Sequence, residues 1–455
     1  MSDPSPTSWA NWAGNQRADR IDVVRPGGPG GSAEIAEVVT SAARAGRRVR
    51  PIGSGHSFTA IGRPEDIQLR LDRHAGLVAF DAAAGLITVQ AGMTLHRLNA
   101  LLEAAGFAAT NLGDVDAQTL AGAVSTGTHG TGARYGGIAT QIRGLELVLA
   151  DGSVVTCSAD ENPDLFRSAR VSLGALGIVS TVTVQVEPAF ALHAVEGGGE
   201  LSDTLRDFDE LADGTDHFEF YWFPHTTRVL TKRNTRRPLA EGISPLSRRR
   251  AWWDDEFLSN SVFGAAVSAG QRFPRLVRPL AKLSGHALGD RAFSDVSHRV
   301  FVSPRRVRFV EMEYAVPRET VVPLVRELAA AVEGSDWRIA VPIEVRVAAA
   351  DDITLSTASG RDTAYVAVHV PPGCPDQEAY FGTLERLAGE VAGRPHWGKL
   401  HGLDAATLRE RYPHFDEFVD LRDRLDPTGV FSNAHLDRIL GPAGDRDDAS
   451  ARGAR

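Results

Sequence analysis

The sequence predicts an α+β protein of two domains, and three observations lead to this fold class. The chain has 455 residues, of which 43% are hydrophobic, and this is more than one hydrophobic core usually serves. Short strand and helix patterns alternate from Ile21 to about Pro188. Beyond Pro188, longer strand patterns dominate, which is typical of a mostly antiparallel sheet flanked by helices.

The first elements are predicted to be a strand, a helix and a second strand. The segment IDVVRP at 21–26 predicts a strand, and Ser32 is expected to be the N-cap of the helix that follows. That helix should stop at Gly46. The segment RRVRPI then enters a strand that ends in the turn Gly-Ser-Gly-His-Ser at 53–57.

A strand at 86–92 and a helix at Leu95–Ala105 come next, and Gly106 ends the helix. The stretch that follows, FAATNLGDVDAQTLAGAVSTGTHGTGARYGG, is dense in Gly, Ser and Thr and shows no period of its own. Long loops without periodicity are usually functional.

Strands of the second domain are predicted in HFEFYWFP, RVLTKR, RFVEMEYAVP, IEVRVAA and TAYVAVHV, and helices at 319–333 and 377–392. The basic, proline-containing region 236–308 includes Arg248–Arg250 and Trp252–Trp253. A solvated insertion is the favoured interpretation of this region over a membrane or partner site.

Composition excludes several classes of protein. The formal charge of -9 argues against nucleic-acid binding, which normally requires a basic excess. The two cysteines, Cys157 and Cys374, form no zinc or disulfide pattern, and no metal site is expected. Because neither a leader nor a long apolar run is visible, we expect a cytoplasmic protein that binds a small molecule and no membrane.

Two glycine-rich turns are candidate phosphate sites. Glycine lets backbone amides approach an anion, as the turn at 53–57 and the cluster at 122–132 would allow. Neither turn is the dinucleotide motif G-x-G-x-x-G or a P-loop. Together they suit a dinucleotide laid across one domain, whereas each alone is equally compatible with an irregular turn.

Glu344 and Arg346 are two apart in the predicted strand IEVRV, so both side chains should project from one face. The apolar residues between and beside them would pack on the other face. An exposed ion pair is the alternative interpretation.

The segments RPIGSGHSF, VQAGMTLHRLNALL, TLAGAVSTGTHGTG, SLGALGIVSTVTVQVEP, EVR and HWGK, in this order, resemble the aldonolactone oxidase branch of the vanillyl-alcohol-oxidase-type flavoproteins. The resemblance covers nearly the whole chain. It implies an FAD-binding domain of two small α/β subdomains at 15–188 and a substrate (cap) domain at 189–440. The segment 395–440 would return to the flavin, and 441–455 would be a disordered tail.

The resemblance implies FAD as cofactor, attached covalently through His56. A histidine that merely satisfies the turn is the alternative. A second attachment through cysteine is not expected, because Cys157 is remote from the second glycine-rich turn. By motif position, the remaining FAD contacts are Gly53, Ser54, Gly55, Ser57, Gly113, Ser125, Thr126, Gly127, His129, Gly130 and Val179.

The same resemblance assigns roles around the reacting carbon. Glu344 suits handling of the hydroxyl proton, and Arg346 suits binding of the lactone oxygens and stabilisation of charge, with the choice of formal base left open between them. Lys399 would add a cation near the flavin or substrate. His369 falls where alditol oxidases contact substrate. Asp114 departs from the small hydroxyl residue of the alditol oxidases, and this favours a lactone.

The implied reaction is oxidation of an L-gulono-1,4-lactone-like substrate by hydride transfer to flavin N5, with dioxygen as acceptor and hydrogen peroxide as product. Gly113 favours dioxygen, because a missing methyl leaves room beside the reactive edge of the flavin. Three alternatives remain open: an alditol oxidase acting on a terminal hydroxyl of a polyol, a lactone dehydrogenase with another acceptor, and a flavin-binding protein without turnover.

Overall fold

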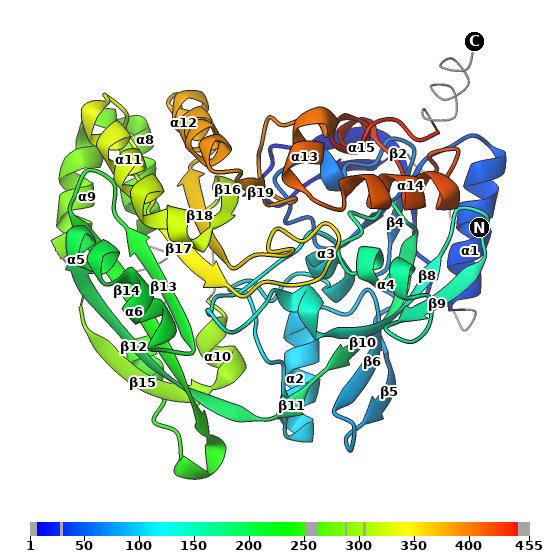
Figure 1. The fold of residues 1–455 in the computed structure, drawn as a ribbon, viewed down its shortest axis with the longest axis horizontal. Helices are drawn as coiled ribbons and strands as arrows, with labels where there is room; N and C mark the ends of the chain where they lie inside the picture. Colours follow the sequence, from blue (N-terminus) through cyan, green and yellow to red (C-terminus); the bar gives the residue numbers. More distant parts are fainter. Residues whose placement is uncertain (1–6, 28–30, 252–262, 287–288, 304–305, 445–455) are drawn as a thin grey trace.

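The computed structural model describes residues 7–27, 31–251, 263–286, 289–303 and 306–444. Two domains lie side by side in Figure 1, one built on small sheets and the other on one large sheet. Trp252–Trp253 and most of the predicted tail, 445–455, lie outside the described residues. Within the described ranges, no helix has both the length and the apolar character to span a bilayer.

The N-terminal domain contains two main sheets. The first has the order β1-β2-β4-β3, with parallel pairing of β2, β4 and β3. Its strands are Thr7–Ala10, Arg17–Val24, Ile67–Arg70 and Val49–Ile52. The second is antiparallel, in the order β5-β6-β10-β8-β9. Its strands are Leu77–Asp81, Leu86–Gln90, Ile178–Gln185, Ile142–Val148 and Val154–Ser158.

Helices of this domain are α1 (Ser32–Arg44), α2 (Leu95–Ala105), α3 (Leu120–Ser125) and α4 (Pro163–Ala169). The predicted bounds of α2 are confirmed, and Gly106 ends it with φ of 77°. The predicted cap at Ser32 is wrong. Gly31 is the N-cap of α1, and the Ser32 hydroxyl contacts Ser180 at 2.7 Å and also Glu146. Tertiary partners thus replace the local cap.

A second correction concerns the long glycine-rich stretch, which we expected to be irregular. Residues 120–125 form α3, and the Thr119 hydroxyl accepts from the backbone N–H of Gly122. The helix is too short to show a period in the sequence. Leu120, Ala123 and Val124 lie on one face of this helix and are buried.

The second domain is built on an antiparallel sheet in the order β15-β12-β14-β13-β17-β18-β16-β19. The strands are Arg291–Val296, Phe190–Glu200, Arg228–Pro238, His217–Trp222, Ile343–Ala348, Thr363–Val370, Val310–Pro317 and Arg394–Pro395. Helices of this domain are α5 (Leu201–Arg206), α6 (Phe208–Asp213), α7 (Arg248–Ala251), α8 (Phe263–Arg272), α9 (Val277–His286), α10 (Ser297–Phe301), α11 (Val321–Gly334) and α12 (Gln377–Glu390). A short pair, β7 (Phe107–Ala108) and β11 (Glu187–Pro188), precedes it.

The central strands of this sheet are buried on both faces. Every residue of β17 and β18 is buried. On one face, alternating apolar residues such as Val345 and Val366 pack with Leu324 and Leu384 of α11 and α12. Because side chains alternate along a strand, the intervening residues project toward the N-terminal domain. The polar residues of these central strands, among them Glu344 and Arg346, therefore lie between the two domains.

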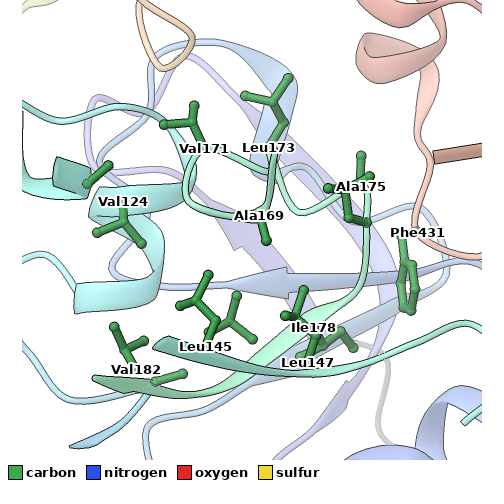
Figure 2. Packing of buried hydrophobic residues seen from close by; sticks show 14 of the residues in the cluster. Val124, Leu145, Leu147, Ala169, Val171, Leu173, Ala175, Ile178, Val182 and Phe431 are labelled. Carbon is green, nitrogen blue, oxygen red and sulfur yellow. The ribbon is translucent and has the colours of Figure 1, made fainter. Parts of the chain in front are cut away.

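The last part of the chain returns to the N-terminal domain. Helices α13 (Ala405–Arg411), α14 (Phe415–Leu425) and α15 (Ala434–Leu440) lie over its strands in Figure 1. The backbone N–H of Val49 donates to Val430 O at 2.7 Å. Figure 2 shows Phe431 among the core residues of the N-terminal domain, where it is fully buried.

Candidate active site

Two cavities meet between the domains. The larger, of about 910 Å³, lies between the polar face of the large sheet and the N-terminal domain. The smaller, of about 320 Å³, lies within the N-terminal domain. Both are lined by His56, Ser57, Gln118 and Thr126. This arrangement suits an elongated ligand that extends from the smaller cavity into the larger one.

Glycines line the smaller cavity. A Cβ on Gly53 would lie 2.3 Å from Thr119 Oγ1, and Gly55 has φ of +72°. Backbone there can approach a ligand in a way that other residues would prevent, which fits a diphosphate. The predicted residues that line it are Gly53, Ser54, Gly55, His56, Ser57, Ser125, Thr126 and Val179.

Gly127 and Gly130 are not among the residues that line either cavity. A Cβ on Gly130 would lie 2.2 Å from Leu112 O, so this glycine permits close backbone packing. Gly127, with φ of +75°, forms the turn behind α3. The structure therefore places both glycines behind the site.

His56 stands where the cavities join. Its ring stacks on the indole of Trp12, with centroids 5.6 Å apart. Burial and the nearby Lys399 ammonium lower the pKa of His56 below its ordinary value. The imidazole is consequently neutral near pH 7, the form whose nitrogen lone pair can bond to carbon.

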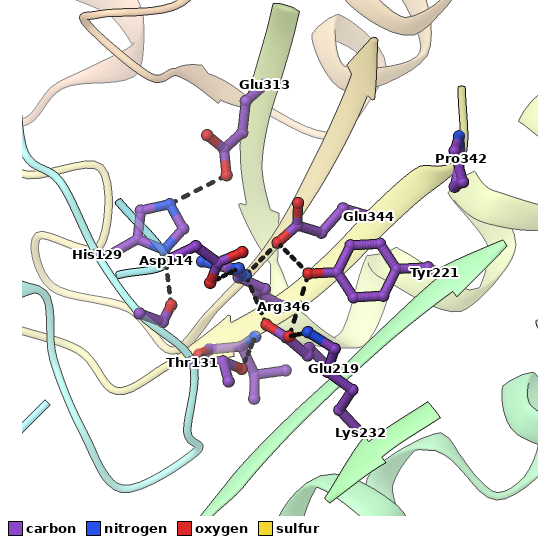
Figure 3. A network of polar contacts seen from close by, with 12 residues as sticks. Asp114, His129, Thr131, Glu219, Tyr221, Lys232, Glu313, Pro342, Glu344 and Arg346 are labelled. Carbon is purple, nitrogen blue, oxygen red and sulfur yellow. Dashed lines mark hydrogen bonds and ion pairs between the residues drawn. The ribbon is translucent and has the colours of Figure 1, made fainter. Parts of the chain in front are cut away.

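Arg346 lies among three carboxylates at the wall of the larger cavity (Figure 3). Its Nη2 is 2.5 Å from Asp114 Oδ1, its Nε is 2.9 Å from Glu219 Oε2, and Nε also contacts Glu344. The Nε–H is not aligned with an acceptor, so its two contacts are ion pairs. Burial alone would lower the pKa of Arg346, but the carboxylates raise it well above its ordinary value. Arg346 remains a cation.

Tyr221 and Lys232 extend this network and were not predicted from the sequence. The Tyr221 hydroxyl is 3.1 Å from Glu219 Oε1 and 3.3 Å from Glu344 Oε1. Lys232 Nζ lies 3.2 Å from Glu219 Oε1. Burial and the carboxylates raise the pKa of Tyr221, which keeps its hydroxyl neutral. The alternation in HFEFYW is the same signal as in IEVRV and could have revealed Glu219.

A second polar cluster borders the larger cavity from β16. Lys399 contacts Glu311 and lies 3.9 Å from Glu313 Oε2. His369 Nε2 is 3.5 Å from Glu311 Oε1. Burial would raise the pKa of Glu311, but Lys399 and His369 outweigh it and lower the pKa to about 2. The predicted residues Lys399 and His369 thus share one carboxylate partner that the sequence analysis missed.

His129 lies in this cluster and not in the glycine-lined cavity. Its Nε2 is 3.0 Å from Glu313 Oε1, and its Nδ1 donates to Gly130 O at 2.8 Å. These groups and His396 place potential ligand atoms within 4.8 Å of one another. However, His396 Nδ1 accepts from the Gly398 N–H, and burial lowers the pKa of His396 to about 4. Its proton is therefore on Nε2, which argues against a metal ligand.

Gly113 and Asp114 lie on the N-terminal side of the larger cavity. A Cβ on Gly113 would lie 3.0 Å from His129 O, so even a methyl would be tight. The structure brings together, around this one cavity, the predicted residues His56, Ser57, Gly113, Asp114, Thr126, His129, Glu344, Arg346, His369 and Lys399.

Comparison with known proteins identifies the family. A model of the D-arabinono-1,4-lactone oxidase family matches residues 182–439, and a model of an FAD binding domain matches 28–158. This chain belongs to the D-arabinono-1,4-lactone oxidase family. It is 41% identical over 434 residues to an L-gulono-1,4-lactone dehydrogenase of Mycobacterium tuberculosis, covering 95% of this chain and 99% of that protein.

Other relatives of this D-arabinono-1,4-lactone oxidase family member include L-gulonolactone oxidase of Mus musculus, 32% identical over 88% of this chain and 91% of that protein. An alditol oxidase of Streptomyces is 31% identical over 85% and 89% of the two chains. A solvent-stable cholesterol oxidase superposes with a TM-score of 0.82 at 20% identity, covering 97% of this chain and 100% of that chain. The predicted α+β, two-domain flavoprotein fold is confirmed, and the protein is an FAD-dependent oxidoreductase.

Proposed function

We propose that this protein oxidises a carbinol of a sugar-derived 1,4-lactone, such as L-gulono-1,4-lactone, with FAD bound across the two cavities. The observation that carries the proposal is the buried pair of Glu344 and Arg346 at the wall of the larger cavity. Their side chains are 7% and 9% exposed, so this is not the exposed ion pair of the alternative interpretation. The names of the relatives support a lactone.

The chain's residues fit the cofactor. Gly53 and Gly55 would hold the diphosphate, Gly113 would border the ring, and His56 would carry the covalent attachment. When bound, FAD supplies the acceptor for the hydride that leaves the carbinol carbon.

The residues around the larger cavity would bind the substrate and prepare its carbinol to lose a hydride and a proton. Arg346 is permanently charged and would donate to the lactone oxygens, stabilising negative charge that develops on them. Glu344 would accept the hydroxyl proton, and the burial of the pair would keep bulk water from competing. Lys399 adds a cation from the β16 side.

Substrate preference tests the proposal. We expect kcat/KM for L-gulono-1,4-lactone to exceed that for xylitol by about 10²-fold or more, because xylitol lacks the carbonyl that Arg346 would bind. Steady-state kinetics with both compounds gives the ratio. A higher value for xylitol would favour an alditol oxidase, and flavin that no lactone or polyol bleaches would indicate a binding protein without turnover.

Dioxygen is proposed as the acceptor on the basis of Gly113, which leaves no side chain at its place in the cavity. A lactone dehydrogenase is the second candidate, favoured by the name of the 41% identical relative. The enzyme is first reduced anaerobically by lactone and then mixed with oxygenated buffer. We expect flavin reoxidation at least as fast as turnover with formation of hydrogen peroxide, whereas slower reoxidation would support the dehydrogenase.

A further inference from the structure

A row of alternating charges crosses five neighbouring strands of the large sheet at one register. Arg291 of β15 pairs with Glu196 of β12, and Glu196 pairs with Lys232 of β14. Lys232 pairs with Glu219 of β13, and Glu219 pairs with Arg346 of β17. Directly opposite residues share a face of the sheet, so these five side chains form one line.

Ion pairs join Arg291 to Glu196 at one end of the row and Lys232, Glu219 and Arg346 at the other, while Glu196 acts on Lys232 through its charge. Arg291 Nε is 2.8 Å from Glu196 Oε2, Lys232 Nζ is 3.2 Å from Glu219 Oε1, and Glu219 Oε2 is 2.9 Å from Arg346 Nε. The side chains of Arg291 and Lys232 are 20% and 18% exposed, whereas those of Glu219 and Arg346 at the inner end are 8% and 9% exposed. The row therefore leads from the sheet edge into the buried wall of the larger cavity.

Lys232 supplies a second positive charge to the row. Arg346 is a single cation in contact with three carboxylates, those of Asp114, Glu219 and Glu344. Burial would lower the pKa of Lys232, but the nearby Tyr221 and the carboxylates of Glu219, Glu196 and Asp114 raise it well above its ordinary value. The second cation offsets part of this negative charge, which would otherwise be costly to bury.

We propose that Glu219 is a positioning residue for Arg346, and that Lys232 holds Glu219 in turn. Neither Glu219 nor Lys232 is among the described residues that line the larger cavity, so both act through Arg346. Glu219 forms an ion pair with the Nε edge of the guanidinium, while Asp114 accepts a hydrogen bond from Nη2. This inference rests on the proposed function, because the effect of Arg346 on lactone oxidation is what the row would control.

The row predicts a gradient of effects on the rate of anaerobic flavin reduction by lactone. A misplacement of about 1 Å at a reacting group can cost 10²-fold, so we expect losses of roughly 10²-fold for Glu219→Gln and about 10-fold for Lys232→Met. Glu196→Gln, one strand further out, should lose less than about 3-fold. Equal losses in all three variants, or none in Glu219→Gln, would overturn the proposal.

Asp352→Asn is the control outside the site, at a carboxylate that is 77% exposed. It removes the carboxylate that lies 2.8 Å from Arg170, whose side chain is 8% exposed, and neither residue lines the two cavities. Flavin reduction should be unchanged in this variant. Bound FAD, measured from the absorption spectrum, should be the same in every variant.

A double-mutant cycle separates positioning from general stabilisation. In an Arg346→Lys background, Glu219→Gln should cost less than about 3-fold, because the guanidinium it positions is gone. Additive losses would assign Glu219 a structural role independent of Arg346 and overturn the proposal.

Failure of the proposed function would be visible separately, as wild-type flavin that no lactone reduces. Crystal structures of the wild-type and Glu219→Gln holoenzymes would then test, without any activity measurement, whether Glu219 positions Arg346. Movement of the Arg346 guanidinium away from its place beside Asp114 supports positioning, and an unmoved guanidinium refutes it.

Discussion

Replacing Arg346 by alanine should slow lactone-driven flavin reduction by about 10³-fold while FAD stays bound, the upper end of what one buried donor to a developing oxyanion contributes. The guanidinium is the cation that its carboxylate neighbours keep charged at the cavity wall. Glu344→Gln, which keeps the side-chain shape but removes the proton acceptor, should lose roughly 10²-fold or more. Stopped-flow reduction under anaerobic conditions measures both rates.

Because Arg346→Ala leaves three carboxylates close together, the variant could lose its fold for reasons unrelated to catalysis. Arg346→Lys keeps the charge but cannot span the same partners, and it should fall between wild type and Arg346→Ala. Arg318→Ala is the control for Arg346→Ala. It also removes an arginine with two carboxylate partners, Asp209 and Asp213, but one that lies outside both cavities. Wild-type rates in Glu344→Gln and Arg346→Lys would exclude the pair from the chemistry.

His56→Ala should convert the cofactor from acid-stable to fully acid-extractable, which is an all-or-none change. The reason is that the proposed attachment uses the imidazole of His56, the neutral ring at the junction of the cavities. Acid precipitation followed by denaturing electrophoresis should give a yellow, fluorescent wild-type band. The variant band should be colourless, with the flavin in the supernatant.

His96→Ala serves as control, because His96 lines the same large cavity yet is absent from the smaller one. Its pellet should remain yellow. A fluorescent His56→Ala band would place the attachment elsewhere, and a colourless wild-type band would show that FAD is bound without a covalent link.

Local signals were enough to predict much of this fold. Leu95–Ala105 has its expected bounds because apolar periodicity and Gly106 are both local. The prediction that Glu344 and Arg346 share one face of a strand also rests on a local signal, their two-residue spacing in β17. The prediction that Ser32 is an N-cap was wrong because its hydroxyl contacts Ser180, which is far away in the chain.

The rest of the site depends on register between distant strands. Glu219 meets Arg346 only because β13 pairs with β17, and no local pattern specifies that pairing. His129 was expected beside the diphosphate, yet its ring lies against Glu313 of β16. Such contacts arise when the two domains close on each other. Single-sequence patterns therefore identified candidate residues but not their partners.

The return of the chain end to the first domain has a consequence for synthesis on the ribosome. Phe431 belongs to the N-terminal core, and Arg50 donates to Phe431 O at 2.8 Å. A nascent chain that has emerged only as far as Pro188 lacks these partners. The cofactor domain should therefore complete its folding only after nearly all of the protein has been translated, and stable flavin uptake should be a late event in its maturation.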